Sequence, residues 1–477
     1  MSEHQKKMGI TPWVRARPES RSSLVPTLHM LEASLLLSLV ILLAKRATMP
    51  NFSHYVSELI KFWNDLGWLA NFLAVAVIML PAIGKIRAMM SRRRQKRRAV
   101  TNTKMNSASY LEWMQRVISK IYAGRELVSL YGKKYPAIIL RPSKKFLYPF
   151  SELCHLASTD IKPLRLSRLQ KDYLRFLGDS VKRPKMKGFA TKEILLDEHG
   201  KIVAVHAQAT NYQQNLVTAH VLEWELFKRY KKNAEITDDI LSELKLRSAY
   251  HGGQPPLQAV LKPCDAFPLI SVQALVIYKD YKDPNSVMWK AIVAQRGKNV
   301  AIKPELWQIQ PAGGFEVYGH EDDDLDIQLR QGFDVRAALF REYAEELYNV
   351  EELSFRSDGR DSGSILAEPH ISQLITLIGD NKASMDFLGI ITDLTVLRHE
   401  LSFLIVIDDP DYCRYPIIGS SEAKRMFSLN MAELKTTFSN QNVHSSSAGL
   451  LQLAIESDRL KSLGISSLLE TADDGMP

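Results

Sequence analysis

Hydrophobic residues along this chain follow several patterns, and each pattern predicts a different kind of element. Two long runs with few charges occupy residues 24–44 and 66–84. Beyond residue 107, apolar residues recur at helical spacing in some stretches and alternate with polar residues in others, which indicates amphipathic helices and half-buried strands. The chain is therefore expected to combine a membrane part with a globular part of mixed α and β structure.

The two apolar runs predict a pair of transmembrane helices joined by a short loop. Residues 66–84 have 19 positions without a charge, and about 20 apolar residues cross a hydrocarbon core of roughly 30 Å. Residues 24–44 are apolar from Ala33 onward but include Glu32, so this run spans the bilayer if its start lies among headgroups or Glu32 finds a partner. A secretory signal is the alternative, but no small-residue cleavage site follows and a second apolar run comes next.

Positive charge is concentrated in the first part of the chain. Residues 1–105 carry 17 Lys and Arg against 5 Asp and Glu, a net charge of +12, so with +9 for the whole chain the remaining 372 residues carry about −3. The cations flank the apolar runs, which predicts a multi-pass inner-membrane protein with both termini in the cytoplasm. Cations beside a span favour contact with inner-membrane lipid. We therefore expect no direct DNA or RNA partner.

Cysteine usage and the apolar pattern together predict the organisation of the chain. Three widely spaced cysteines without metal-ligand spacing indicate a reducing compartment and no disulfide framework. The predicted parts are a cytoplasmic segment at 1–23, two spans with a basic stop at 24–98, a juxtamembrane helical and linker region at 99–180, and a cytoplasmic domain at 181–477 with its core at about 270–410.

Local patterns predict the elements of the globular part. Helical spacing predicts helices within 107–131, 217–232 and 445–463. Alternating residues around a turn predict two hairpins and two further strands. The hairpins lie at 190–209 and from Val272 to Arg296, and the further strands lie at 385–397 and 400–409.

The segment 311–350 holds the candidate chemistry. PAGGFEVYG is followed after an insertion by FREYAEELYNV, in which Glu342, Glu345 and Glu346 are three and four residues apart. Residues at these spacings share one side of an α-helix, here called the acidic face. Like charges repel at this distance. The acidic face therefore either meets bulk water, with the apolar stripe of the helix buried, or holds a divalent metal beside phosphates.

These residues resemble the Nudix family, whose box reads G-x5-E-x7-R-E-U-x-E-E-x-G-U, with U a bulky aliphatic residue. Gly314 stands at the first glycine, and the R-E and E-E positions are matched at the acidic helix. The resemblance implies a mixed-sheet α/β/α domain of α+β class. It also implies that Mg²⁺ is bound by three carboxylates with an arginine as their charge partner, here Glu342, Glu345, Glu346 and Arg341.

The box also departs from the family pattern in several places. His320 stands at the position of the first box glutamate, an insertion follows it, and Tyr348 and Asn349 replace a glycine and an apolar residue. These departures favour ligand recognition over catalysis. The predicted ligand-binding residues are two cations near the predicted cleft, together with the glycine pair and the arginine of the box: Arg296, Lys298, Gly313, Gly314 and Arg341.

Two spans, a basic stop and a degenerate Nudix box together resemble the two-transmembrane Nudix effectors of bacterial cyclic-oligonucleotide antiphage signalling (CBASS), of the CD-NTase-associated type. The resemblance implies that the cytoplasmic domain binds a cyclic oligonucleotide. It further implies that the spans assemble as a homo-oligomer and disrupt the inner membrane, causing abortive infection. Two alternatives stay open: a membrane-tethered, Mg²⁺-dependent Nudix hydrolase of nucleoside diphosphate derivatives, and a scaffold without a ligand.

Overall fold

The computed structural model describes residues 57–58, 61, 89, 91–93, 95–178, 186–297, 305–317, 324–350, 364–412, 417–419 and 423–470. The chain divides into two compact units, Met1–Met90 and Ser91–Pro477. All helices and strands named below belong to the second unit. None of the helices in these ranges is long and apolar enough to cross a membrane, and the two predicted spans lie outside the described residues.

The centre of the second unit is a mixed eight-stranded sheet. Its strands follow the order β13-β8-β7-β12-β11-β3, with β10 beside β7 and β9 beside β8. β7 and β12 run parallel, whereas the other pairs are antiparallel. The strands are β3 (Ala137–Leu140), β7 (Ile270–Asp280), β8 (Met288–Arg296), β9 (Trp307–Ile309), β10 (Ala312–Gly314), β11 (Ala383–Asp393), β12 (Arg398–Ile407) and β13 (Ala423–Asn430).

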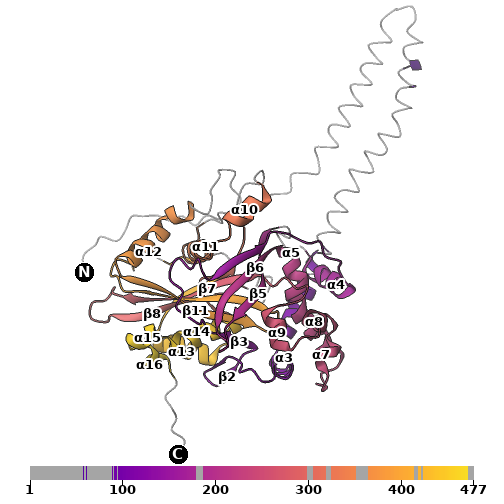
Figure 1. Ribbon diagram of the computed structural model, residues 1–477, viewed down its shortest axis with the longest axis horizontal. Helices are drawn as coiled ribbons and strands as arrows, with labels where there is room; N and C mark the ends of the chain where they lie inside the picture. The colour runs from indigo at the N-terminus through magenta and orange to yellow at the C-terminus, as the bar shows by residue number, and fades with distance from the viewer. Residues whose placement is uncertain are drawn as a thin grey trace, which may run out of the picture. The chain divides into compact units, whose positions relative to one another are not determined.

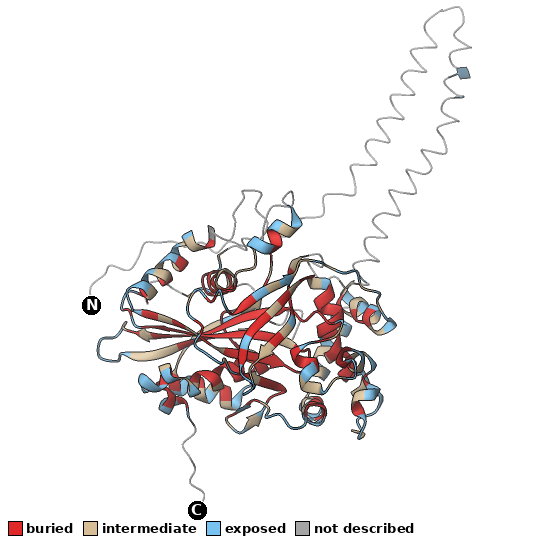
Figure 2. Ribbon diagram, in the orientation of Figure 1, coloured by how far each residue is buried: buried red, intermediate tan, exposed pale blue. Residues whose placement is uncertain are grey.

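Helices cover both faces of this sheet (Figures 1 and 2). β7 is therefore buried at every position except Lys279, as expected for a strand packed on both sides. Alternate residues of β7 enter two separate cores, with Val272 in one and Leu275 in the other. The prediction of a layered α+β domain with a mixed sheet is confirmed. One face carries α11 (Val335–Tyr348) and α12 (Pro369–Gly379), and the other carries α13 (Met431–Asn440), α14 (Ser445–Glu456), α15 (Asp458–Ser462) and α16 (Ile465–Leu469).

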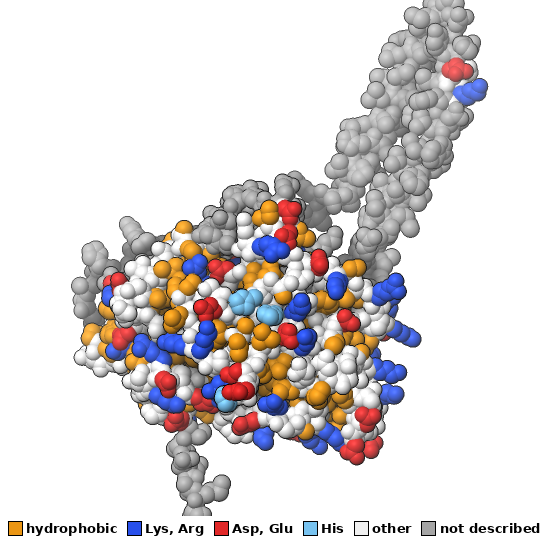
Figure 3. All heavy atoms as spheres, in the orientation of Figure 1, with side chains coloured by type: hydrophobic (Ala, Val, Ile, Leu, Met, Phe, Trp, Pro, Cys, Tyr) orange, Lys and Arg blue, Asp and Glu red, His pale blue; other side chains and the backbone are white. Residues whose placement is uncertain are grey.

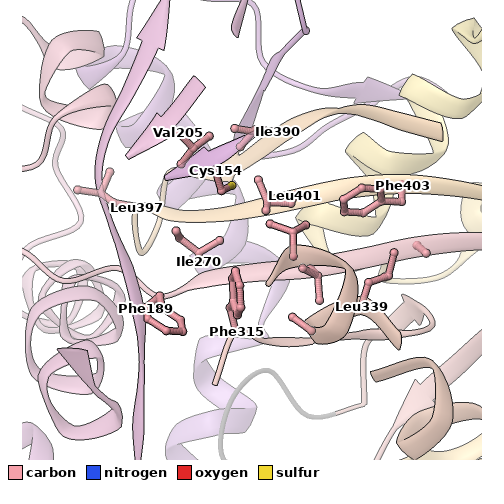
Figure 4. Close-up of a cluster of buried hydrophobic side chains, with 14 of the residues drawn as sticks. Cys154, Phe189, Val205, Ile270, Phe315, Leu339, Ile390, Leu397, Leu401 and Phe403 are labelled. Carbon is pink, nitrogen blue, oxygen red and sulfur yellow. The ribbon is translucent and has the colours of Figure 1, made fainter. Parts of the chain in front are cut away.

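A second sheet of three strands, in the order β4-β6-β5, packs against the first. Its strands are β4 (Cys154–Ser158), β5 (Lys187–Leu196) and β6 (Ile202–Asn211), and β5 and β6 form the hairpin predicted at 190–209. The N–H of Phe189 in β5 donates to the Phe315 carbonyl at 3.1 Å, just after β10. The two rings lie 5.0 Å apart, and Figure 4 shows them in the same buried cluster. The two sheets therefore share a core.

Helices at one end of the main sheet form a further layer (Figure 1). The helix predicted over 217–232 begins as a π-helical segment, η2 (Leu216–His220), before α6 (Val221–Lys232). In and beside η2, side chains of Asn215 and Thr218 accept the N–H groups of Leu269 and Phe267 at 3.1 and 2.9 Å. The irregular helix thus docks this layer onto the segment that enters β7. The other helices are α3 (Ala108–Ile121), α4 (Arg168–Leu177), α5 (Tyr212–Asn215), α7 (Ile240–Glu243), α8 (Lys245–His251) and α9 (Pro256–Leu261).

Two predicted helices are shorter than expected. The helix predicted within 107–131 ends at Ile121, because Gly124 with φ 89° turns the chain away, and β1 (Ser129–Leu130) pairs with β2 (Lys133–Lys134) instead. The helix predicted over 445–463 is interrupted at Ser457, whose side chain accepts from Leu460 N and caps α15. The hairpin from Val272 to Arg296 and the strands after 383 are confirmed as β7, β8, β11 and β12.

Two buried histidines make the second unit sensitive to acid. Burial lowers the pKa of His251 and of His399 from the usual 6.5 to about 4, so both are neutral in the folded state. Between pH 4 and pH 6.5, both histidines are protonated in the unfolded chain but stay neutral in the folded chain. The free energy of unfolding should therefore fall as pH is lowered from 6.5 to 4, by about 1.4 kcal/mol per pH unit for each histidine.

Denaturant unfolding at several pH values measures this slope. His251→Gln and His399→Gln should each reduce it by one histidine's share. His199 is the matched control, because its side chain is 72% exposed and its replacement should leave the slope unchanged. An unaltered slope in both buried variants would show that other groups govern acid unfolding.

Candidate functional site

The acidic helix of the sequence is α11, and its ends are fixed by local residues. The side chain of Asp334 accepts the N–H groups of Arg336 and Ala337 at the start of the helix, which satisfies donors that have no partner within it. Asn349 ends the helix in the left-handed conformation with φ 53°. The predicted apolar stripe is buried and belongs to the core that includes β7, as Figure 4 shows for Leu339.

One carboxylate of the acidic face is buried in an ion pair. The side chain of Arg341 donates through Nη2 to Glu342 Oε1 at 2.8 Å and to the Gly314 carbonyl at 2.6 Å. The two side chains are only 6% and 10% exposed. Arg341 therefore links α11 to β10 and neutralises a carboxylate that has little contact with water. Arg341 was predicted to be a charge partner of the carboxylates, and the structure shows this pairing for Glu342.

The glycine turn is where the acidic face meets the sheet. A Cβ atom at Gly313 would overlap the Glu342 carboxylate, so glycine is needed for this close approach. The Ala312 N–H donates to Glu346 Oε2 at 3.1 Å. Glu345 is half-buried on the same helix. The acidic face is therefore turned toward residues 312–314 of β10 rather than lying open in bulk water.

Two strands, β7 and β5, hold this turn in place. Gly313 pairs with Val272 of β7, and Gly314 pairs with Ser271. The segment just after the turn is bonded to β5, since the Val317 N–H donates to the Lys187 carbonyl at 3.0 Å. Residues from the second sheet therefore help to fix the turn on which the acidic face packs.

The structure places the predicted ligand residues only in part. Arg296, at the end of β8, donates to the side chain of Gln308 on β9, the strand that leads into the glycine turn. Gly313, Gly314 and Arg341 come together as described above. Lys298 lies outside the described residues, as does His320. The role of these residues in ligand binding stays a prediction.

Sequence reasoning missed an aromatic cluster at the end of α11. Tyr348, which departs from the box pattern, lies with its hydroxyl 3.4 Å from that of Tyr343 and 3.3 Å from that of Tyr412. Burial raises the pKa of Tyr343 and of Tyr412 well above the usual value, so these hydroxyls stay protonated. The ring of His370 stacks on Tyr348 with centroids 3.8 Å apart. Apart from the unusual Tyr348, no local sequence signal marks Tyr412 or His370.

The carboxylates of the acidic face have partners within the protein. Over the described ranges, no three His, Cys, Asp or Glu side chains are grouped so that they could hold a metal ion. Glu342 is engaged by Arg341, and Glu346 by a backbone N–H. Binding of Mg²⁺ by Glu342, Glu345 and Glu346 therefore stays a prediction.

Comparison with known proteins finds similarity among solved structures. No family model and no curated protein matches the chain. The NUDIX domain of Shewanella oneidensis NrtR, solved with ADP ribose, is 13% identical, with 40% of this chain and 87% of that one covered and a TM-score of 0.22. A mutT/nudix family protein from Listeria innocua is 12% identical, with 41% and 98% covered and a TM-score of 0.24.

A third similar structure is a two-function enzyme. The bifunctional NMN adenylyltransferase/ADP ribose pyrophosphatase of Francisella tularensis, solved with AMP and a manganese ion, is 15% identical. The similarity covers 48% of this chain and 52% of that one, with a TM-score of 0.23. Nudix domains thus recur among the similar structures, and the proposals below rest on the residues of this chain.

Proposed function

We propose that this chain is a membrane-embedded effector of a bacterial CBASS antiphage system. Its α+β domain binds a cyclic oligonucleotide at the acidic face and glycine turn, and its predicted spans then assemble and disrupt the inner membrane. The observation that carries the proposal is the Arg341 bridge to Glu342 and Gly314, which turns the acidic face toward β10. A helix whose acids served only solubility would direct them into water.

The same contacts favour recognition over hydrolysis. Glu342 and Glu346 already have partners within the protein, and Tyr348 is fixed in an aromatic cluster at a position where the Nudix box has glycine. A site held in this way can change its packing when a ligand binds.

The surface charge favours a compact ligand over a nucleic acid polymer. On the face in Figure 3, Lys and Arg side chains are interspersed with Asp and Glu. A nucleic-acid surface is expected to concentrate one sign of charge along a stripe. The predicted membrane part, with its basic flanks at 1–23 and 92–98, supports inner-membrane lipid as the other partner and a cytoplasmic position for both termini.

A second candidate function is an Mg²⁺-dependent Nudix hydrolase tethered to the membrane. It is favoured by the four box residues that α11 keeps, with Glu345 only half-buried. In that case all three carboxylates, Glu342, Glu345 and Glu346, would have to turn toward the metal when it binds with the diphosphate.

One paired experiment separates these functions. The purified full-length chain is incubated with cyclic di- and trinucleotides and with ADP-ribose, each with and without Mg²⁺, and both thermal stability and product release are measured. The effector is supported if a cyclic nucleotide raises the melting temperature by several degrees without being consumed, as expected for a ligand well above its dissociation constant.

The controls make the result specific to the acidic face. Glu345→Gln is compared with Glu198→Gln, a carboxylate on the β5–β6 turn that is 86% exposed. Metal-dependent product release that Glu345→Gln removes and Glu198→Gln keeps would establish the hydrolase instead. If no cyclic nucleotide shifts the melting temperature, the effector proposal fails.

A further inference from the structure

A fully buried arginine joins the outer helices to the main sheet. The side chain of Arg247 on α8 has no exposed surface. Its guanidinium donates to the hydroxyl of Tyr122 at 3.1 Å, to the carbonyl of Leu394 at 2.7 Å and to that of Thr395 at 2.6 Å. Tyr122 is the residue that ends α3, and the two carbonyls lie in the turn between β11 and β12. One side chain thus holds three separate elements together.

Burial of the Arg247 guanidinium costs free energy unless its three hydrogen bonds are kept. The oxygens that accept from the Arg247 guanidinium are all uncharged, so no ion pair with that group offsets removal of its charge from water. Glu225 on α6 instead accepts the backbone N–H of Arg247 at 3.0 Å and fixes the start of α8. The planar guanidinium can satisfy all three acceptors only in one relative position of α3 and the turn. A shift of either element would leave buried donors without partners.

On one side, the arginine restrains α3, the first labelled helix after residue 105. α3 follows the basic helical residues 95–105 after a short break. The indole of Trp113 donates to the Ala234 carbonyl at 2.6 Å, and Lys120 pairs with Asp238 at 2.7 Å, both in the segment after α6. α3 is therefore attached to the helical layer along its length and to the sheet through Tyr122 at its end.

On the other side, the arginine contacts the sheet that carries the candidate site. The Leu394–Thr395 turn leads into β12, which runs parallel to β7 with Glu400 opposite Ser271. Ser271 is in turn opposite Gly314 of β10, whose carbonyl accepts from Arg341. A chain of contacts thus leads from the acidic face across β10, β7 and β12 to Arg247, which bonds to Tyr122 at the end of α3.

We propose that Arg247 is a latch that transmits rearrangement of the acidic face to α3 and so to the membrane part. This inference rests on the proposed function for its biological purpose. When the glycine turn shifts on ligand binding, movement of β7 and β12 displaces the Leu394–Thr395 turn. The bonds of Arg247 then either carry α3 along or break and release it. Without the arginine, the site and α3 are uncoupled.

Hydrogen exchange of the full-length chain, read by mass spectrometry, tests this coupling. Arg341→Met perturbs the site by removing its bonds to Glu342 and Gly314. In a chain with Arg247, this change should speed exchange in the second half of α3 by about tenfold, because local opening becomes easier. In an Arg247→Met background, the same change should add less than about twofold, as expected once the connection is cut.

Two further variants keep the test decisive. Arg229→Met is the matched control, since Arg229 is also largely buried but bonds to Glu243 and the α6–α7 segment instead of the sheet. It should leave the response of α3 to Arg341→Met intact. If Arg247→Met does not fold, Tyr122→Phe removes one of the three acceptors and should reduce the response without abolishing it.

An equal response of α3 with and without Arg247 overturns the latch. Full coupling in a chain that never permeabilises vesicles would refute the membrane function and leave the latch standing.

Discussion

Replacing Arg341 with methionine is expected to lower the free energy of unfolding by about 3–5 kcal/mol, because removing one partner leaves a buried charge without compensation. Glu342 would then keep its carboxylate against Gly313 with little access to water, and the Gly314 carbonyl would lose its donor. Denaturant unfolding of residues 91–477, which form one compact unit, measures the change.

A double variant and a neighbouring arginine provide the controls. Arg341→Met combined with Glu342→Gln should recover much of the lost stability, since no unpaired charge is left. Arg336 lies on the same helix and pairs with Asp334, but its side chain is 25% exposed. Arg336→Met should therefore cost less than Arg341→Met, about 1 kcal/mol, because the Asp334 carboxylate is 34% exposed and stays in contact with water when its partner is removed. Equal losses in the two single variants would contradict the importance of the buried pair.

The elements predicted best from sequence are those whose signal is local. β5 and β6 alternate around a tight turn, and β7 and β8 are apolar runs separated by a short polar loop, so residues close in sequence identify both hairpins. The periodicity of α11 likewise predicted a helix with its apolar stripe inside. In each case the spacing of the apolar residues, two in a strand and about 3.6 in a helix, identifies both the element and its buried side.

The elements that sequence reasoning missed depend on distant partners. β3 is a four-residue strand at the edge of the main sheet, where it pairs with β11, about 250 residues further along the chain. β4 is also short and pairs with β6. Neither has enough residues for an alternating pattern, and their surroundings contain several prolines. Short strands of this kind are defined by the sheet that they join.

The candidate site shows the same division. Helical spacing predicted that Glu342, Glu345 and Glu346 share one side of α11. It did not predict that this side packs on the glycine turn, because the partners are a backbone N–H at Ala312 and a carbonyl at Gly314, which leave no mark in the residue types. The position of Tyr412 beside Tyr348 is equally invisible in sequence, since 64 residues separate them.

The unusual residues of the box acquire a common explanation from these contacts. Tyr348 stands where the box has a small residue, and its ring contacts the buried Tyr343 and Tyr412 and the half-buried His370. Such a cluster stiffens the end of α11 that carries Glu345 and Glu346. A stiff helix end and a buried connection to α3 would pass a shift of the glycine turn on to α3 instead of absorbing it locally. Under the proposed function, the outcome of binding should be visible at the predicted spans.

Removing residues 1–90 is expected to abolish membrane permeabilisation while leaving ligand binding unchanged. The deletion takes away one compact unit, with both predicted spans, and retains the unit that holds α11, β10 and Arg247. A bilayer is breached only if segments that enter it assemble around a path for water, and the deletion removes the two segments to which this role is assigned. The measurements are dye release from vesicles rich in anionic lipid, growth of cells expressing each form, and calorimetric titration with the cyclic nucleotide that stabilises the full-length chain.

The matched control for this deletion keeps the spans and disables the site. Full-length Arg341→Met should bind the same cyclic nucleotide poorly and release no dye, whereas the shortened chain should bind normally and release none. The two variants thus lose the same activity for opposite reasons, and mixing them should not restore it, because the spans and the site must belong to one chain for α3 to connect them. Cell killing by the shortened chain at the level of the full-length chain would place the toxic activity in residues 91–477 and exclude the membrane mechanism.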